Sequence, residues 1–481
     1  MKTNHGFKTI IMLFNILLLV SVAYAADYYV SPTGNDSNPG TIDKHWQHIA
    51  FATCGGAYGC PIVTNNPNKL KAGDTLYIKG GIYNEHDIVF ANSGSSGNYI
   101  TIKNYPNETP IINGGYTTPS GSTFHPTFEI DNKNYIMFDG LEITQGLRAN
   151  VRIAYDHPTD HIIIQNCNLH DFVCSDNSGQ FYIGAGGASN ITIKNNLLHG
   201  VYNYANRGLN TTSIMIFNAH DNIIIQNNEI YHSNKAIYYK HSDNSNYATT
   251  IKNNLIYDME DSVGAISLNM QHVVVENNII RDSIKAIRLW HDDALCSDLI
   301  TSYITLNHNT IVDCTQGIIL GRKWVSGTKC DGANNTTITN NIVYGYTGNE
   351  HRGLSIHANW QGDDNIANNG DETDESATTL TYNLFYSSTV TVPISMLSDA
   401  TTSPYNGYFD TTSCPASMTC SNNTQSAPNF VDYTGKNFTL AAGSAGKNAA
   451  SDGTDIGADI SKVGPIQQTG YKKPKSPLIL Q

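Results

Sequence analysis

Charged side chains are scarce in this chain of 481 residues, at 14% of the total. A coiled coil or a long helical rod needs many Glu and Lys residues, so the composition argues against both. Positive charge is the scarcer sign, because 28 Lys and Arg stand against 41 Asp and Glu, a formal net charge of −13. This balance argues against nucleic acid as the main partner, since phosphate contacts require a basic surface. A polyanionic ligand stays compatible with it, because a local basic patch can lie on an acidic protein.

Long apolar runs are missing after the N-terminal segment, so we expect no membrane span. No spacing of Cys and His resembles a zinc site. Lys2 and Lys8 precede an apolar run at 10–22, and a small-x-small pattern follows this run at 23–25. This is typical of a secretory signal peptide, and the run is short for a transmembrane helix of about 20 residues. We therefore predict that residues 1–25 are removed and that the mature protein is secreted, either extracellular or periplasmic.

The nine cysteines fit an oxidising compartment, and their odd number leaves at least one thiol free or bonded between molecules. Two pairs bracket short loops and predict disulfides, namely Cys54 with Cys60 and Cys414 with Cys420. Cys167 occupies a repeat position that is otherwise Asn, which favours a buried thiol or a bond to Cys174. Two members of a third set can pair with each other, the set being Cys296, Cys314 and Cys330.

A segment of ten residues recurs through the middle of the chain, with alternating apolar, mostly β-branched residues around an Asn pair. Its copies are IIIQNCNLHD at 162–171, ITIKNNLLHG at 191–200, IIIQNNEIYH at 223–232, TTIKNNLIYD at 249–258, VVVENNIIRD at 273–282, ITLNHNTIVD at 304–313 and TTITNNIVYG at 336–345. The copies begin about 24 to 32 residues apart, which is the period of a solenoid. Shorter apolar strands follow, such as KAIYYKH at 235–241 and KAIRLWH at 285–291. Two or three strands in each coil predict an all-β fold, a right-handed parallel β-helix.

The Asn pairs are expected to be structural, because amides stacked from coil to coil can form hydrogen-bonded ladders. The open end of a solenoid exposes strand edges and needs a cap. We therefore predict an N-terminal cap, the β-helix itself, an irregular C-terminal extension and a flexible tail. These segments are 26–60, 61–388, 389–462 and 463–481, in that order.

Four further segments carry a family pattern: DYYVSPTGNDSNPGT at 27–41, KAGDTLYIKGGIYNE at 71–85, YITIKNYPNETPIING at 99–114 and GTDIGA at 453–458. With them the chain resembles the secreted, pectate lyase-like right-handed β-helix proteins. The pattern is shared by family-nine pectate lyases and by the chondroitinase-B and alginate lyase group. The resemblance implies the fold over nearly the whole mature chain and an acidic polysaccharide as partner. It leaves the reaction open, because the same scaffold carries lyases, hydrolases, epimerases and inert adhesins.

Aligning the second strands by their Ala-Ile or Gly-Ile step predicts which side chains share one outer face. Because side chains alternate across a strand, Tyr238 and Lys240 point outward if Ile237 and Tyr239 point inward. Aromatic rings offer flat surfaces for sugars, and cations pair with carboxylates, so we predict that this face binds an acidic glycan. The predicted substrate-binding residues, on these columns or just past the strands, are Tyr238, Asn269, Trp290, His291, Arg322 and Trp324.

The predicted catalytic residues are Lys240 and Arg288, which lie two coils apart in this alignment and hence about 10 Å apart. β-Elimination removes the proton beside a uronate carboxylate, and that proton becomes acidic when a cation or Ca²⁺ neutralises the carboxylate. The related lyases use a Lys or Arg on the exposed strand face, and both residues match in kind and place. We assign Lys240 as the base and Arg288 as the carboxylate-binding group, and the reverse assignment stays open.

Calcium requires clustered oxygen ligands, and the turn before the strand at 264–270 holds three acids. These predicted metal ligands are Asp258, Glu260 and Asp261. The turn loosely resembles the acidic turn of the family-nine pectate lyases. It departs from that pattern because Glu260-Asp261 replaces a pair of Asp residues and because an acid expected near Gly264 is missing. A second acidic loop at 363–375 is interpreted as solvated, since charge runs are usually exposed.

Three other functions fit the same scaffold. A carbohydrate-binding or cell-surface protein would use the same face without cleavage, and a uronate epimerase would use related acid–base chemistry. A glycoside hydrolase needs two carboxylates about 5–10 Å apart, and the aligned outward columns contain none. We therefore predict a monomeric polysaccharide lyase acting on an acidic glycan, pectate-like before alginate-like.

Overall fold

The structure, a computed structural model, describes most of the chain in sixteen segments. They are 25–56, 59–119, 123–174, 177–202, 210–218, 221–240, 248–260, 264–289, 301–321, 324–325, 328–329, 335–348, 352–358, 378–398, 406–411 and 418–465.

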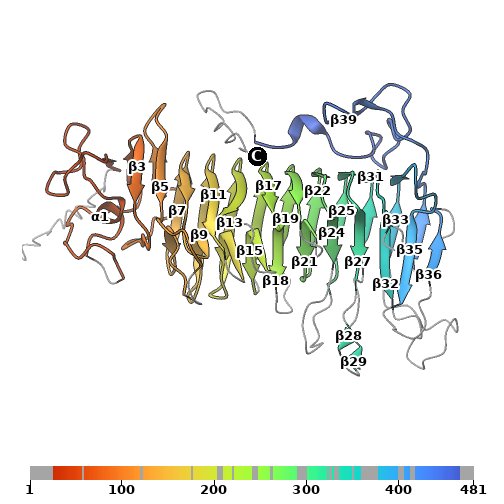
Figure 1. Cartoon of the computed structure of the whole chain (residues 1–481). Coiled ribbons are helices and arrows are strands. Elements are labelled where there is room, and N and C mark those ends of the chain that lie inside the picture. The colour runs from red at the N-terminus through yellow and green to blue at the C-terminus, as the bar shows by residue number, and fades with distance from the viewer. Residues whose placement is uncertain are drawn as a thin grey trace, which may run out of the picture.

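Three long sheets of stacked strands form the body of the molecule (Figure 1). The first sheet contains β1 (Asp27–Val30), β2 (Thr75–Ile78), β4 (Ile100–Asn104), β7 (Asn134–Asp139), β10 (Thr159–Gln165), β13 (Ala188–Lys194), β16 (Asp221–Gln226), β19 (Thr249–Lys252), β22 (Val273–Glu276), β25 (Thr305–Asn307), β30 (Thr337–Thr339), β33 (Thr378–Thr381) and β37 (Met418–Ser421). The second contains β3 (Gly81–Asn84), β5 (Pro110–Asn113), β8 (Glu142–Thr144), β11 (Asn168–Val173), β14 (Leu197–Tyr202), β17 (Glu229–Ser233), β20 (Leu255–Met259), β23 (Ile279–Arg281), β26 (Thr310–Val312), β31 (Ile342–Tyr344) and β34 (Leu384–Tyr386).

The third sheet contains β6 (Phe128–Ile130), β9 (Ala149–Ile153), β12 (Ser178–Ile183), β15 (Thr211–Phe217), β18 (Lys235–Lys240), β21 (Ile266–Leu268), β24 (Lys285–Leu289), β27 (Gln316–Leu320), β32 (Leu354–Ala358), β35 (Ile394–Ser398) and β36 (Asn406–Phe409). Strands from successive coils pair in parallel, and only the last pair, β35 with β36, is antiparallel in this sheet. One strand from each sheet completes a coil, so the predicted right-handed parallel β-helix is confirmed.

The core is a set of stacked aliphatic columns. Ile162 pairs with Ile191, which pairs with Ile223, and all three are fully buried. The residues between them point outward because side chains alternate across a strand. β-Branched residues pack well on this pleated surface, so the repeat itself specifies both the strands and the side that is buried.

The two members of each Asn pair have different roles at the turn between the first and second sheets. The first member, such as Asn253 or Asn277, takes a left-handed φ near +55°, which Asn tolerates better than most residues. The second member is buried and joins a ladder through the coils. In this ladder Asn254 Oδ1 accepts from the backbone N–H and the Nδ2 of Asn228, both at 3.0 Å. The expected structural role of the pairs is confirmed.

The N-terminal end of the stack carries the short helix α1 (Ile49–Thr53), which is buried along its whole length. The predicted disulfide between Cys54 and Cys60 is present and closes the loop after this helix. Cys167 is a buried thiol, which is one of the two alternatives predicted for it. Burial raises its pKa to about 12. Cys414, the predicted partner of Cys420, lies outside the described residues.

The chain after the last coil folds back over the outer face of the second sheet (Figure 1). This segment includes β38 (Phe430–Asp432), β39 (Asn437–Leu440) and the 3-10 helix η2 (Ile460–Lys462). Its apolar side chains, among them Phe438 and Ile456, pack on Val312 and Ile342 of the sheet. A small hairpin of β28 (Trp324–Val325) and β29 (Thr328–Lys329) completes the described elements. No helix in the described part of the chain is long and apolar enough to cross a membrane.

Candidate functional site

The outer face of the third sheet brings together the side chains that the strand alignment placed in one column. The register joins Tyr238 to Ser267, Ser267 to Arg288, and Arg288 to Ile319. Towards the N-terminal end the same column continues through Met215, Tyr182, Arg152 and Glu129. The predicted alignment of these strands is therefore confirmed, and it extends further than the sequence indicated.

Tyr238 is more buried than expected for a residue on an outer face, with 3% of its surface exposed. It packs with Tyr182 and Met215 in an apolar cluster that lies outside the coil. Lys235 is fully buried beside it, with Nζ 5.1 Å from the centre of the Tyr238 ring. A fully buried lysine is rare, and the repeat pattern alone did not indicate one at this position.

The two predicted catalytic residues lie on strands of this face. Lys240 is the last residue of β18, and its Nζ donates a 2.7 Å hydrogen bond to Asn177 Oδ1. The same Nζ lies 5.9 Å from the ring centre of Phe217, the neighbour of Lys240 on β15. Arg288 is half-buried on β24, two strands beyond β18, which corresponds to about 10 Å. Arg288 approaches the backbone of Gly264 closely. A Cβ added at Gly264 would lie only 3.1 Å from the Cβ of Arg288, and Gly264 also has a φ of +142°, so a residue without a side chain suits this position.

A group of cations and rings continues this face towards the N-terminal coils. The guanidinium of Arg152 lies 4.1 Å from the ring centre of Tyr155, and that of Arg148 lies 4.0 Å from that of Phe124. Tyr182 tilts against Phe124 at 4.7 Å. Burial and then the neighbouring Tyr155 raise the pKa of Tyr182, while the two arginines oppose the rise. This group was not predicted, because it precedes the regular repeats, although the alternation in ANVRI at 149–153 was a usable signal.

The face carries little negative charge. Among the described strands of the third sheet, Glu129 is the only carboxylate, and its Oε1 accepts a 2.6 Å hydrogen bond from Arg152. Glu129 is therefore matched by Arg152, and the other charged side chains on these strands are positive. An acidic glycan is the class of ligand that such a surface attracts.

The other predicted site residues have different outcomes. Asn269 is buried directly after β21. Trp324 lies in β28, and nothing further is described for its side chain. The predicted residues outside the described segments are Trp290, His291, Arg322 and Asp261.

The acidic turn that was predicted to bind calcium is described in part. Asp258 is exposed, has a left-handed φ of +59°, and its Oδ2 lies 3.0 Å from Nδ1 of His232. Glu260 follows β20 and is also exposed. Carboxylate oxygens suit Ca²⁺, so the donor type fits, but the described residues supply only two of the three predicted ligands.

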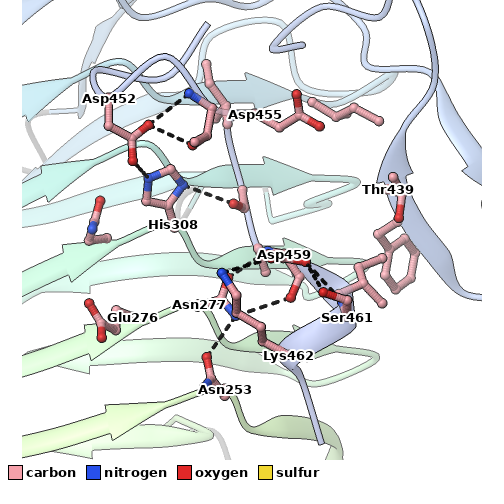
Figure 2. Close-up of a pocket in the computed structure, with 18 of the residues that line it drawn as sticks. Asn253, Glu276, Asn277, His308, Thr439, Asp452, Asp455, Asp459, Ser461 and Lys462 are labelled. Carbon is pink, nitrogen blue, oxygen red and sulfur yellow. Dashed lines mark hydrogen bonds and ion pairs between the residues drawn. The ribbon is translucent and has the colours of Figure 1, made fainter. Parts of the chain in front are cut away.

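A pocket of about 950 Å³ lies between the first sheet and the C-terminal segment, and Figure 2 shows the side chains that line it. His308 Nε2 lies 3.2 Å from Asp452, and His308 Nδ1 lies 3.1 Å from the carbonyl oxygen of Gly457. Hydrogen bonds from Thr454, and then the charge of His308, lower the pKa of Asp452. The polar groups of this pocket mostly bond to each other and fasten the segment to the coils.

A ladder of stacked rings covers the outer face of the second sheet. His170, His199 and Tyr231 stack at 5.2 and 5.0 Å between ring centres. Burial opposes protonation of His170, but hydrogen bonds to Asp171 and Glu142 outweigh it and raise its pKa to about 9. Burial, reinforced by the charge of His170, lowers the pKa of His199 to about 4. Perturbed groups mark functional sites or structural networks, and here each shift has a local packing cause.

Comparisons with known proteins agree with this fold. Residues 28–220 match the family described as Pel9A-like, right handed beta helix region. The solved structure of pectate lyase Pel9A superposes on 91% of this chain and 96% of its own, with a TM-score of 0.52 and 12% sequence identity. At that identity the likeness concerns the fold alone. The expected resemblance to pectate lyase-like right-handed β-helix proteins is confirmed.

Two curated relatives match short segments. The uncharacterised protein YwoF of Bacillus subtilis (strain 168) is 33% identical over 120 residues, 25% of this chain and 22% of that protein. Pectate lyase PEL9 of Emericella nidulans is 33% identical over 97 residues, 20% of this chain and 20% of that protein. The matched segments therefore span about a fifth of the length of each relative.

Proposed function

We propose that this chain is a secreted polysaccharide lyase that cleaves an acidic, uronate-containing glycan by β-elimination, with pectate as the first substrate to test. The observation that carries the proposal is the single face of the third sheet on which Arg152, Tyr182, Lys240 and Arg288 lie. The pectate lyases among the similar proteins support this class of substrate.

Lys240 and Arg288 divide the chemistry in this proposal. Arg288 binds the uronate carboxylate and neutralises its charge, which makes the neighbouring C–H proton acidic. Lys240, in its neutral form, takes that proton as general base. The electron pair of the C–H bond becomes a carbon–carbon double bond, and the glycosidic oxygen leaves and takes up a proton. The reverse assignment, with Arg288 as the base and Lys240 as the carboxylate-binding group, uses the same geometry. The kinetics of the two single variants distinguish the two assignments.

The N-terminal group of Arg148, Arg152 and Tyr155 extends the proposed substrate-binding face. Arg152 lies five strands from Arg288 along the sheet, about 24 Å, so several sugar units fit between them. The rings of Tyr155 and Phe124 lie against the two guanidinium groups and hold them in place. This distance favours a polymer as substrate over a short oligosaccharide.

Calcium remains part of the proposal as a cofactor at Asp258, Glu260 and Asp261. When bound, the ion would supply positive charge that neutralises a substrate carboxylate. The hydrolase alternative is weakened on the described strands of the third sheet, because Glu129 is the only carboxylate on them and is paired with Arg152. Three acids lie at nearby turns in the sequence: Asp292 and Asp293 are outside the described residues, and Asp313 accepts a 2.6 Å hydrogen bond from the hydroxyl of Tyr433.

The test measures the absorbance of unsaturated uronate when the mature protein is mixed with polygalacturonate, alginate or chondroitin, with and without Ca²⁺. We expect product on one polymer and a loss of at least about 100-fold in kcat/KM for Lys240→Ala. Arg288→Ala should raise KM and also lower kcat, because it removes both a carboxylate-binding group and the charge that makes the C–H proton acidic. Lys103→Ala removes a half-buried lysine from the first sheet and is the matched control, with activity unchanged.

Two results would contradict the proposal. Wild-type activity in both Lys240→Ala and Arg288→Ala would remove the face from the chemistry. A wild-type protein that binds a polymer without forming unsaturated product would instead be a carbohydrate-binding β-helix protein, or an epimerase if the recovered polymer has changed its uronate composition.

A further inference from the structure

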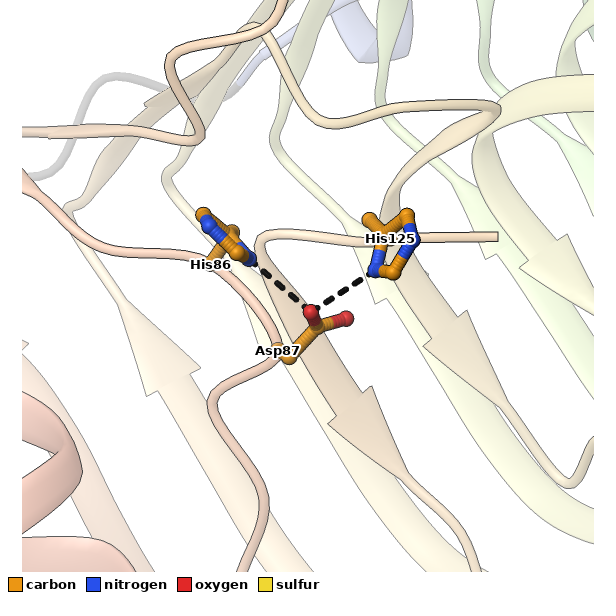
Figure 3. A group of neighbouring side chains, drawn as sticks. All are labelled: His86, Asp87 and His125. Carbon is orange, nitrogen blue, oxygen red and sulfur yellow. Dashed lines mark hydrogen bonds and ion pairs between the residues drawn. The ribbon is translucent and has the colours of Figure 1, made fainter. Parts of the chain in front are cut away.

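A cluster of two imidazoles around one carboxylate lies near the N-terminal end of the stack, apart from the residues assigned above (Figure 3). Asp87 Oδ2 lies 2.9 Å from Nδ1 of His86 and 2.9 Å from Nδ1 of His125. Each of the three side chains offers one potential metal-ligand atom, and these three atoms all lie within 4.8 Å of one another.

The backbone holds the two sides of the cluster together. The N–H of Asp87 donates a 2.7 Å hydrogen bond to the carbonyl oxygen of Pro126, and that of Ile88 donates to Thr127 at 3.1 Å. Ile88 also pairs in parallel with Phe128 at the start of the third sheet. Residues 38 positions apart in sequence are therefore fixed beside each other before any ligand binds. Such preorganisation reduces the cost of ordering a binding site.

An aromatic ring closes one side of the cluster. Tyr116 stacks on His125 at 5.6 Å between ring centres and meets His86 edge-on at 5.1 Å. The side chains of His86, Asp87 and His125 still keep 46%, 29% and 39% of their surface exposed. The cluster is thus held from the protein side and open to solvent on the other.

The other His–Asp pairs of the described chain differ from this cluster in composition. Single imidazoles pair with single carboxylates in His48–Asp36, His157–Asp131, His161–Asp160, His232–Asp258 and His308–Asp452, and one imidazole, His170, contacts both Asp171 and Glu142. Those pairs offer one nitrogen ligand each. The cluster at Asp87 offers two nitrogens and an oxygen, which is one of the donor sets of three-ligand zinc sites.

We propose that His86, Asp87 and His125 bind a divalent transition-metal ion, with Zn²⁺ as the ion that the donor set favours. Zinc bonds of about 2.0–2.1 Å place tetrahedral ligand atoms about 3.3 Å apart. The two Nδ1···Oδ2 distances of 2.9 Å need to open by about 0.4 Å, which small side-chain rotations provide.

Proton balance also suits the site. Each imidazole donates its Nδ1–H to Asp87 without metal, and each passes to the tautomer with the proton on Nε2 when Nδ1 binds the ion. The exposed rings exchange these protons with water. The fourth position faces solvent and holds a water molecule or an oxygen of a ligand, as in zinc sites with three protein ligands.

Calorimetric titration of Zn²⁺ into the tag-free mature protein tests the proposal without any polysaccharide, so its outcome is independent of the lyase assignment. We expect one saturable site, weakened at least about tenfold by His86→Ala and by His125→Ala. His157→Ala removes an Asp-paired imidazole that is more exposed, at 60%, and should leave the affinity unchanged. The thiols of Cys167 and Cys314 are buried with pKa values raised to about 12, so they do not compete.

Cobalt titration gives a second measurement, because Co²⁺ bound at the site should replace the weak visible spectrum of the hydrated ion by the intense one of a four- or five-coordinate ion. Asp87→Asn keeps an oxygen for one ligand bond but removes the negative charge, so it should bind more weakly than the native protein. Circular dichroism confirms that each variant is folded. Absence of saturable binding to the native protein, or equal weakening by His157→Ala and His125→Ala, would overturn the proposal.

Discussion

Removing one amide from the buried Asn ladder should be costly, and the cost can be estimated from the hydrogen bonds of Asn254. Its Oδ1 accepts from the N–H and the Nδ2 of Asn228, and its Nδ2 donates to Ile225 O and Asn278 Oδ1. Asn254→Ala leaves the buried N–H of Asn228 without its acceptor, at about 1–3 kcal/mol. The three other groups each lose a bond worth about 1 kcal/mol, so the free energy of unfolding should fall by roughly 4 to 6 kcal/mol.

The measurement is urea unfolding followed by circular dichroism, together with hydrogen exchange of the amides in the coils on either side. The control is Asn222→Gly, which removes an exposed amide that makes a 2.6 Å hydrogen bond to Asn190 Oδ1. Asn222 has a φ of +50°, so Gly adopts its backbone without strain and the expected change is below about 1 kcal/mol. Because each coil contacts only its neighbours, faster exchange in Asn254→Ala should concentrate around its own coil.

The reasoning would be refuted if Asn254→Ala and Asn222→Gly unfolded at the same urea concentration with the same slope. Such a result would mean that the stacked amides merely replace hydrogen bonds that water or the backbone supplies equally well. It would also leave the stacked aliphatic core as the sole source of coil-to-coil stability.

Three further predictions concern pH and the C-terminal segment. Because the pKa of His170 is raised to about 9, its contribution to stability is complete below about pH 6.5 and is lost as the pH rises through 9. Because the pKa of His199 is lowered to about 4, the free energy of unfolding falls as the pH drops from about 6.5 to 4. His199→Gln should remove this loss, which urea unfolding measured at each pH would detect. Gly457→Ala places a methyl group 2.6 Å from both Ile342 Cδ1 and Thr310 Oγ1 at a φ of +92°, so the C-terminal segment should detach and become sensitive to protease. A pH-independent difference between His199→Gln and the native protein, or native protease resistance in Gly457→Ala, would contradict these two inferences.

Much of the fold follows from short-range pattern. The alternating apolar residues predicted the strands, and their recurrence predicted the stacking of Ile162, Ile191 and Ile223. The Ala-Ile step also predicted the register that aligns Tyr238 with Arg288. These inferences succeeded because neighbouring strands of a β-helix carry equivalent positions of consecutive repeats.

The site was less predictable where contacts join dissimilar parts of the chain. The burial of Tyr238 depends on Tyr182 and Met215, which lie on earlier coils with different sequences. His86 and His125 meet at Asp87 because the chain between them has the length of one coil and returns to the same place in the fold. No sequence motif indicates that length.

The amino-acid sequence by itself determined the all-β solenoid, its coil period and the ladder of buried Asn residues, because these depend on residues that recur at regular positions. The tertiary structure alone decided that Arg148, Arg152 and Phe124 continue the face of Lys240, and that the chain after residue 429 covers the second sheet. The physical reason is that such contacts form between residues separated by one or more whole coils. Their meeting depends on the turns in between, whose lengths vary while the strands stay constant.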